Sequence, residues 1–216
     1  MEIRRTANAG ILLTLDDVKI LLDGVCRAVD PYPATPPEIA EELTACKPDA
    51  VFFTHCHEDH FAPAYCREFS GPIYGTQQVA DELSGGAITE KTATIGKVKV
   101  HAVPTRHMGH YGKTTEHQSF VIEGSQTIWF LGDASPTEMR KFADFPKPDV
   151  LMIPYPYIST PAALKMVEAL FPCKIVLLHM PLPENDPESI WQSVRDGMEH
   201  LKAYLYVPEL GETLNI

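Results

Sequence analysis

The sequence predicts an α/β protein with a four-layer arrangement, in which two β-sheets pack together and helices cover their outer faces. Short apolar runs typical of buried strands alternate with segments of helical periodicity in both halves of the chain. The 216 residues are 44% hydrophobic, which is enough for a proper core. No linker, repeat or low-complexity tract divides them, so we expect a single domain spanning residues 1–216.

The first half of the chain begins with two apolar runs, ILLTL (11–15) and VKILLD (18–23), which are joined by an Asp-Asp turn and are typical of a β-hairpin. Residues 36–47 have helical periodicity with prolines at their start, where a missing N–H is tolerated. The apolar, β-prone run AVFFT (50–54) predicts a buried strand. Three further elements are expected in this half: a short helix after Pro63, a strand over 72–76 and a helix over 77–84.

The second half of the chain continues this alternation. Strands are expected at 97–105, 119–124 and 127–133. Helices and apolar strands then follow in turn: helix 136–143, strand 149–155, helix 161–170, strand 174–180, helix 187–201 and strand 204–208. Strands interleaved with helices in both halves favour two packed sheets with helices outside.

Composition and charge argue against several classes of function. Eighteen Lys and Arg against 29 Asp and Glu give a formal charge of −11, which disfavours general binding to a nucleic-acid backbone. No apolar run reaches the ~20 residues that a membrane span needs. The first residues lack the uninterrupted apolar stretch of a signal peptide, and the five cysteines form no CxxC pair. We therefore expect a cytoplasmic protein with reduced thiols and a small-molecule substrate, without a membrane or nucleic-acid partner; the oligomeric state is not indicated.

Histidine is the residue type that stands out, and the segment THCHEDH (54–60) holds four potential metal ligands directly after a buried strand. In an extended segment, His55 and His57 point to the same side. Two imidazoles on one side of a strand end form half of a zinc site, and Asp59 and His60 add an oxygen and a nitrogen ligand. Four candidates in six residues exceed what one ion can use, so the segment predicts a two-metal site of the kind that hydrolytic enzymes employ.

Further candidate ligands occur at later strand ends. They are His107 after the strand 97–105, Asp133 at the end of 127–133 and His179 near the end of 174–180. A side chain at a strand terminus is held rigidly while its loop stays open to substrate. A polar surface loop that is merely rich in histidine is the alternative interpretation. The recurrence of ligand types at strand ends favours the metal site.

The pattern HxHxDH after an apolar strand, followed by a distant histidine, a strand ending in Gly-Asp and a last strand ending in His, resembles the metallo-β-lactamase superfamily over residues 11–180. The resemblance implies a four-layer αββα sandwich of the metallo-β-lactamase type, with the metals at one edge. It also implies two divalent metal ions per chain, usually zinc, with manganese or iron in some branches. The chain is most similar to small stand-alone metal-dependent hydrolases such as the ascorbate-phosphate lactonase-like group.

The resemblance divides the candidate ligands between two metals. It implies that His55, His57 and His107 hold the first metal, that Asp59, His60 and His179 hold the second, and that Asp133 bridges them. It further implies a metal-bridging hydroxide as the nucleophile, because coordination lowers the pKa of water toward about 7. Asp59 has a second expected role, as the catalytic residue that orients this hydroxide or accepts its proton.

Three histidines compete for the last position of the first metal. His107, just past a strand end, is the expected ligand, and His110 and His117 lie in the glycine-containing loop that follows. These two are candidates for substrate binding or for donating a proton to the leaving group, with solvated loop histidines as the alternative. Asp23 matches an acidic residue that orients a ligand in the superfamily, or else simply ends a strand. Tyr155 is expected either to line the pocket or to pack as a core aromatic.

Three hypotheses of function remain open. The first is a small-molecule hydrolase that attacks a lactone, ester, thioester or amide. The second is a phosphodiesterase or nuclease with the same two metals, and the charge of −11 argues against its nuclease form. The third is a non-hydrolytic role, as a di-iron redox centre or a metal-binding sensor, and the complete ligand set disfavours the sensor. Two divalent ions make their surroundings locally electropositive, which favours a small anionic substrate.

Overall fold

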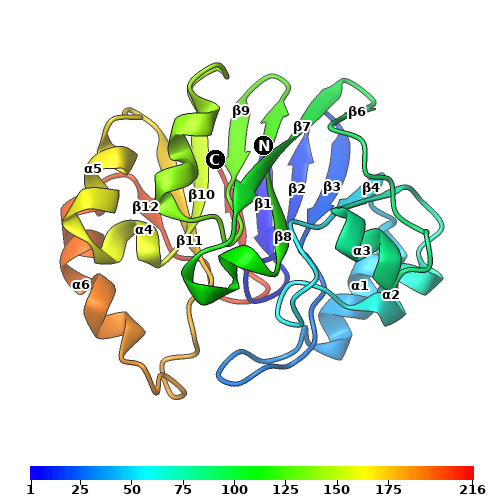
Figure 1. Ribbon diagram of the computed structural model, residues 1–216, viewed down its shortest axis with the longest axis horizontal. Helices are drawn as coiled ribbons and strands as arrows, with labels where there is room; N and C mark the ends of the chain where they lie inside the picture. Colours follow the sequence, from blue (N-terminus) through cyan, green and yellow to red (C-terminus); the bar gives the residue numbers. More distant parts are fainter.

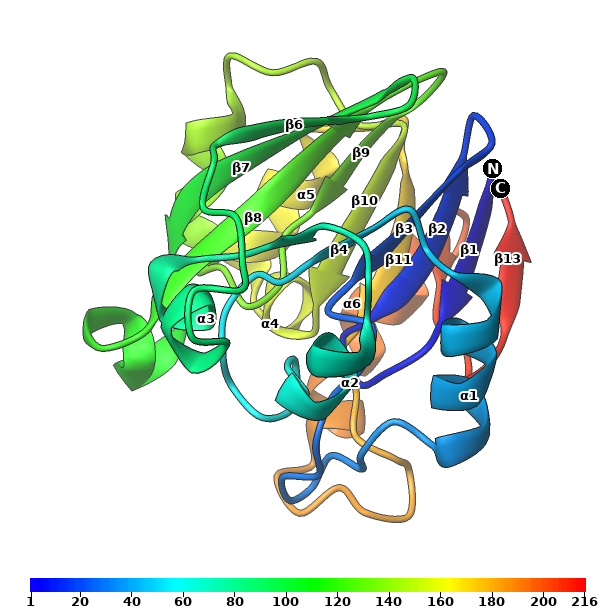
Figure 2. The same ribbon diagram turned by 90° about the vertical axis from the view of Figure 1, so that its right-hand side faces the viewer.

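Two mixed β-sheets face each other at the centre of the molecule, and helices cover the outer side of each (Figures 1 and 2). The structure is a computed structural model that describes residues 1–216. The first sheet has six strands in the order β13-β1-β2-β3-β4-β5, and the second has seven in the order β12-β11-β10-β9-β8-β7-β6. The predicted four-layer αββα sandwich is therefore confirmed.

The first sheet combines strands from both ends of the chain. Its strands are β1 (Glu2–Arg5), β2 (Ile11–Leu15), β3 (Val18–Leu22), β4 (Ala50–Phe52), β5 (Ile73–Tyr74) and β13 (Thr213–Asn215). β2 and β3 form the predicted hairpin, and both residues of its turn, Asp16 and Asp17, have positive φ. β13 pairs with β1, so the two ends of the chain lie side by side, as Figure 2 shows.

The second sheet begins as an antiparallel meander and ends as a parallel array. Its strands are β6 (Thr92–Ile95), β7 (Val98–Arg106), β8 (Glu116–Glu123), β9 (Thr127–Phe130), β10 (Val150–Pro154), β11 (Lys174–Leu178) and β12 (Leu205–Tyr206). The pairs from β6 to β9 are antiparallel, whereas those from β9 to β12 are parallel. β6, together with β1 and β13 in the other sheet, was not among the strands predicted from the sequence.

Helices form the two outer layers. The first sheet is covered by α1 (Pro37–Cys46), α2 (Pro63–Glu68) and α3 (Gln77–Glu82), and the second by α4 (Pro156–Ser159), α5 (Pro161–Glu168) and α6 (Ile190–Leu201). Two 3-10 helices, η1 (Gly109–Lys113) and η2 (Pro136–Phe142), complete the structure, and η2 takes the place of the helix predicted at 136–143. Every helix is too short or too polar to span a bilayer.

The strands divide their side chains between apolar clusters by simple alternation, because neighbouring residues in a strand point to opposite faces. In β3, Ile20 and Leu22 enter the central cluster between the sheets, whereas Leu21 packs with residues of α1 to α3. In β10, Met152 points into the central cluster and Leu151 packs with residues of α5 and α6. Strands buried on both faces therefore read as continuous apolar runs.

The carboxyl ends of several parallel strands meet at one edge of the sandwich. β3 and β4 run parallel in the first sheet, and β9, β10 and β11 run parallel in the second. The loops that follow β4, β9 and β11 approach one another closely there, since their residues make mutual polar contacts. Loops at the carboxyl ends of strands are the usual place for a binding site in such folds.

Candidate metal centre

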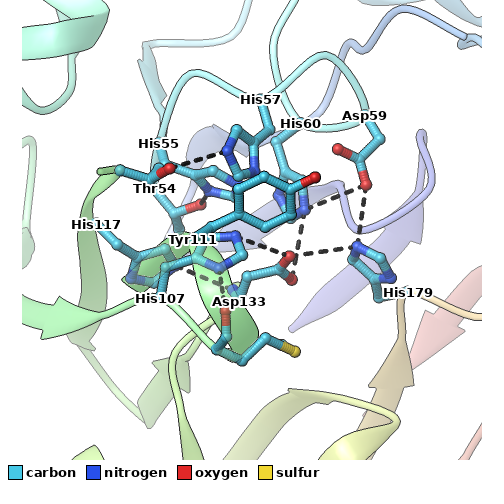
Figure 3. A network of polar contacts seen from close by, with 12 residues as sticks. Thr54, His55, His57, Asp59, His60, His107, Tyr111, His117, Asp133 and His179 are labelled. Carbon is cyan, nitrogen blue, oxygen red and sulfur yellow. Dashed lines mark hydrogen bonds and ion pairs between the residues drawn. The ribbon is translucent and has the colours of Figure 1, made fainter. Parts of the chain in front are cut away.

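The seven predicted ligands come together at this edge, as Figure 3 shows. The loop after β4 carries His55, His57, Asp59 and His60; His107 follows β7, Asp133 follows β9 and His179 follows β11. All of them except His57 are buried. Because each side chain starts from a strand end or from the turn beside it, the sheets hold the cluster in place.

His55, His57 and His107 form one group, whose candidate ligand atoms lie within 4.8 Å of one another. His55 Nδ1 is 2.9 Å from Thr54 Oγ1, and His107 Nδ1 donates to a neighbouring backbone carbonyl at 2.7 Å. The Nε2 atoms of both side chains are buried and have no hydrogen-bond partner. His57 differs, because its Nε2 contacts Thr115 Oγ1 at 3.0 Å and leaves Nδ1 for a ligand role.

Asp59, His60 and His179 form a second group of the same size. Asp59 Oδ2 lies 3.0 Å from His179 Nε2 and 3.7 Å from His60 Nε2. Asn8 Nδ2 donates to the same oxygen at 3.2 Å, and the Asn8 carbonyl accepts the backbone N–H of His179. Asn8 thus holds two members of this group, although nothing in its local sequence signals that role.

The Asp133 carboxylate lies between the two groups. Its Oδ1 is 3.4 Å from His60 Nε2, and its Oδ2 is 3.4 Å from Nε2 of both His107 and His179. Gly132 permits this placement, because it has a φ of +53° and a Cβ there would lie 2.7 Å from Thr54 Cγ2.

The donor set fits metal ions. Asp133 Oδ1 and the Nε2 atoms of His60, His107 and His179 are buried without hydrogen-bond partners. Buried polar atoms are nearly always satisfied, and cations bound within the cluster would satisfy all four. Imidazole nitrogens with carboxylate oxygens are a donor set that suits zinc, manganese and iron.

Asp23 and Thr54 orient two of the histidines from behind. Asp23 Oδ2 accepts from His60 Nδ1 at 2.9 Å and from the Thr54 hydroxyl at 2.6 Å, while Oδ1 accepts the Thr54 N–H at 2.8 Å. Because its hydroxyl donates to Asp23, Thr54 accepts from His55 Nδ1. Both imidazoles therefore hold a proton on Nδ1 and direct Nε2 at the centre. Asp23 makes the contact expected of an orienting acid, whereas Thr54, directly before His55, has no role in the sequence analysis.

His117 supports Asp133 from within the protein. Its Nε2 accepts the backbone N–H of Asp133 at 3.0 Å, and its Nδ1 donates to Thr105 Oγ1 at 2.7 Å. Thr105 in turn contacts Ser119 Oγ at 3.1 Å, and Ser119 donates to a backbone carbonyl of the β9 end. Both ring nitrogens of this buried histidine are hydrogen-bonded within the protein. The expected role of His117 in substrate binding stays a prediction.

His110 lies on η1, exposed to solvent. Its ring centroid is 3.9 Å from that of Tyr111, and none of the polar contacts of the centre involves it. Its expected roles in proton donation and substrate binding stay predictions.

Three tyrosines surround the cluster, two of them unforeseen. The Tyr111 ring centroid is 4.9 Å from that of His57, and the Tyr32 centroid is 4.5 Å from that of His179. Tyr155, the predicted pocket residue, lies on the same side with its centroid 6.4 Å from His179. Tyr32 lies on a loop and Tyr111 on η1, both outside the segment 54–60, so only the folded chain brings them here.

Burial and charge act in opposite directions on the pKa values of the centre. Burial lowers the pKa of His55 well below its usual range, so this imidazole is neutral. Burial acts to raise the pKa of Asp59, but His60 and His179 outweigh it and hold that pKa at about 2. Burial likewise acts to lower the pKa of His179, but Asp133 and Asp59 raise it to about 9. The carboxylates thus attract positive charge to the centre, as a cation site requires.

Comparison with known proteins gives a consistent result. The profile of the beta-lactamase superfamily domain matches residues 19–180. A UPF0173 metal-dependent hydrolase of Pyrobaculum calidifontis is 24% identical over 237 residues, and the match covers all of both chains. A possible metal-dependent hydrolase of Veillonella parvula has a TM-score of 0.80 at 18% identity, covering 100% of this chain and 99% of that one. An isothiocyanate hydrolase from Delia radicum gut bacteria has a TM-score of 0.76 at 19% identity, with the same coverage.

Proposed function

The chain belongs to the family of beta-lactamase superfamily domains, and from that premise we propose that it is a metal-dependent hydrolase of a small molecule. One observation carries the proposal: the Nε2 atoms of His55, His60, His107 and His179 are buried in one cluster and have no hydrogen-bond partner. Relatives that are named metal-dependent hydrolases, one of them matched over its whole length, support it.

We assign two ions to the cluster. The first is held by His55 Nε2, His57 Nδ1 and His107 Nε2, the second by Asp59, His60 Nε2 and His179 Nε2, and Asp133 contacts members of both groups. Divalent ions held there would supply an activated water and would polarise the bond under attack. Zinc is the metal we propose, because histidine with carboxylate is a common zinc donor set.

The protein contributes fixed geometry and proton positions. Asp23 and Thr54 keep protons on the outer nitrogens of His60 and His55, so that the inner nitrogens stay available. Asn8 fixes one oxygen of Asp59, which is the carboxylate we propose to orient the attacking water and accept its proton. Preorganised groups of this kind need no rearrangement when the reaction occurs.

Tyrosine side chains define the substrate side of the centre. Burial raises the pKa of Tyr32 and of Tyr155, so both hydroxyls are protonated at neutral pH and can donate to negative charge on a substrate. Aromatic rings beside the cluster favour a small organic molecule, and the charge of −11 disfavours nucleic acid. We propose a small lactone, ester, thioester or amide as substrate, with anions favoured near the metals.

The cysteines bear on where the protein works. All five are free, including the buried Cys26, Cys66 and Cys173. Free thiols are typical of a reducing compartment, and on this basis we propose a cytoplasmic location.

The proposal is tested by loading the protein with zinc, manganese or iron and assaying it on a panel of lactones, esters, thioesters and amides. The likeness to an isothiocyanate hydrolase adds an isothiocyanate to the panel. We expect about two ions per chain by elemental analysis and turnover of at least one carbonyl substrate. Asp133→Ala should abolish turnover and lower the metal content, whereas Asp144→Ala, a change at an exposed aspartate far from the centre, should alter neither.

Three outcomes would contradict the proposal. A protein that takes up no divalent metal is not a metal-dependent hydrolase. A metal-loaded protein that cleaves bis-nitrophenyl phosphate but no carbonyl substrate is a phosphodiesterase, and iron with visible absorbance and no hydrolysis indicates a redox centre.

A further inference from the structure

A cavity of about 540 Å³ lies beside the metal centre and is lined by none of its candidate ligands. Its wall comes from the end of β1 and the loop after it, from residues 33–34, and from the segments 180–183 and 207–210. The loops that carry residues 33–34 and 180–183 touch each other, because Asn185 Nδ2 donates to the Pro31 carbonyl at 3.2 Å; both lie at the lower end of the molecule in Figure 1. The cavity has the size of a small-ligand pocket, for which about 300–1,000 Å³ is typical.

Most of the cavity wall is apolar. It includes four prolines together with Met180, Leu182, Trp191, Val207 and Leu210. The Trp191 ring is fixed in place, since its Nε1 donates to the Pro181 carbonyl at 2.9 Å. A wall of this kind favours an occupant with an apolar body, because binding removes apolar surface from water on both sides.

Arg5 is the one cation in this wall. Its guanidinium donates four hydrogen bonds, all of them to backbone carbonyls, of Ala7, Asn8, Met180 and Pro208. It has no carboxylate partner, although buried charges are usually paired.

The charge on Arg5 is therefore incompletely compensated. Burial lowers the pKa of Arg5, which shows that its surroundings oppose the cation. A guanidinium has five N–H groups, so after four hydrogen bonds one N–H on Nη1 remains free. An anion within hydrogen-bond distance of Nη1 would compensate this charge, and the cavity wall provides none.

We propose that this cavity is a second ligand site, which binds a small apolar molecule carrying a single carboxylate. The carboxylate accepts from Arg5 Nη1 and supplies the missing counter-charge, while the apolar body packs against Leu182 and Trp191. Glu209 lies at the exposed rim of the cavity. It limits the ligand to one negative charge, because its carboxylate would repel a second one.

The new site shares a wall with the metal centre. Asn8 and Met180 line the cavity, and Arg5 Nη2 donates to the carbonyl oxygens of both. On the far side of this wall, the Asn8 side chain holds Asp59 and Met180 directly follows His179. The two sites are therefore adjacent but share no candidate metal ligand, so binding at Arg5 does not depend on the proposed hydrolysis.

The experiment is a titration of the metal-loaded protein with hexanoate, followed by Trp191 fluorescence and by ligand-observed NMR. 1-Pentanol and pentylamine have the same five-carbon apolar chain without the carboxylate; 1-hexanol and hexylamine match hexanoate in total carbon number and serve as the controls. We expect saturable binding of hexanoate and about tenfold weaker binding of hexanol, because hexanol loses a hydrogen bond between charged groups. Hexylamine should not bind, since its ammonium meets the Arg5 cation.

Variants separate the cavity from nonspecific binding. Arg5→Met should weaken hexanoate binding by about tenfold or more. Because Arg5 also ties four carbonyls together, a second variant leaves it intact: Ala34→Trp fills the cavity from its exposed rim and should abolish binding. Ala162→Trp, at an exposed position of α5, is the matched control and should bind like the original chain. Glu209→Gln should strengthen binding roughly two- to fivefold by removing a like charge.

Three results would overturn the proposal. The first is hexanol binding as tightly as hexanoate, which removes the role of the carboxylate. The second is unchanged hexanoate binding by Ala34→Trp, which places the ligand elsewhere. The third is the absence of saturable hexanoate binding to the folded, metal-loaded chain.

Discussion

Thr54 shows how one hydroxyl can decide which nitrogen of an imidazole faces a candidate metal site. It donates to Asp23 and therefore accepts from His55, so the proton of His55 is held on the outer nitrogen. Asp23 sets the proton of His60 in the same way. Two side chains outside the seven candidate ligands thus orient two of the inner nitrogens.

Replacing Thr54 with valine keeps its shape and its backbone N–H but removes the hydroxyl. We expect Thr54→Val to lower zinc affinity by about 10–100-fold, the usual effect of losing a residue that orients a ligand. Competition with a chromophoric chelator measures this directly. Thr94→Val, at an exposed position of β6, is the matched control, and equal zinc affinity in the two variants would show that the hydroxyl does not matter.

His107 and His110 provide a second contrast between neighbouring residues. His107 Nε2 is buried in the cluster without a hydrogen-bond partner, whereas His110 is exposed on η1. We expect His107→Ala to lose metal and His110→Ala to retain about two ions per chain by elemental analysis. Metal loss in His110→Ala with full retention in His107→Ala would reverse the assignment.

At the scale of elements, the 3-10 helix η2 is tied to β7 by one carboxylate. Glu138 Oε2 accepts the backbone N–H of Arg106 at 3.1 Å and the Lys141 ammonium at 2.7 Å. Burial acts to raise the pKa of Glu138, but these two hydrogen bonds outweigh it and hold the pKa below its usual value. Glu138 therefore stabilises the fold in its ionised form.

This pKa shift sets the sign of a pH dependence. A carboxyl with a depressed folded pKa contributes stability above its unfolded pKa of about 4.3, and the contribution is lost as pH falls through the folded pKa. We expect Glu138→Gln to lower the free energy of unfolding by roughly 0.5–1.5 kcal/mol at pH 7, allowing for solvent screening, and by much less near pH 3. Urea unfolding of metal-free protein at both pH values measures the difference. Glu41→Gln, on the exposed side of α1, should show no such pH-dependent change.

Which elements the sequence predicts depends on where their stabilisation comes from. β3, β4, β10 and β11 bury both faces, so their apolar runs identify them. β1, β6 and β13 carry polar or small residues such as EIRR, TATI and TLN, and they form because a neighbouring strand offers its hydrogen bonds. Residue propensity and hydrophobic pattern do not show which neighbouring strand a segment will pair with.

The same distinction applies to the centre. All seven candidate ligands follow predicted strands or lie in one short motif, so their positions in the sequence are enough to identify them as candidates. Asn8 and Tyr32 lie on loops and Tyr111 lies on η1, none of them in a motif. Only the packing of distant segments puts them beside His57, Asp59 and His179. The role of His117 depends on its contacts with Asp133 and Thr105, which a sequence cannot show.

At the scale of the whole molecule, the candidate metal centre draws its ligands from both sheets. His55 to His60 follow a strand of the first sheet, while His107, Asp133 and His179 follow strands of the second. Ions bound between them would link the two halves of the sandwich. Ligands that bind only the folded chain stabilise it by mass action.

Removing the metals should therefore lower thermal stability. At a metal concentration about a thousandfold above Kd, one occupied site adds about 4 kcal/mol to the free energy of unfolding. In a chain of this length, each kcal/mol of stability raises the Tm by about 2–4 °C. With two such sites, about 8 kcal/mol in all, we expect chelation to lower the Tm by roughly 15–30 °C, as measured by circular dichroism. Asp133→Ala should show a much smaller shift, and an unchanged Tm on chelation of the original chain would mean that metals do not hold the sheets together.

The pairing of β13 with β1 has a consequence for chain connectivity. Glu2 lies opposite Asn215, and the backbone N–H of Ile216 donates to the Met1 carbonyl at 3.2 Å. A short peptide could join these neighbouring ends, and a new pair of ends could be opened in an exposed turn such as that at Gly85, where an added Cβ would meet no atom within 4 Å. The order of elements along the chain is thus separable from their arrangement in space, which makes the protein a natural candidate for circular permutation.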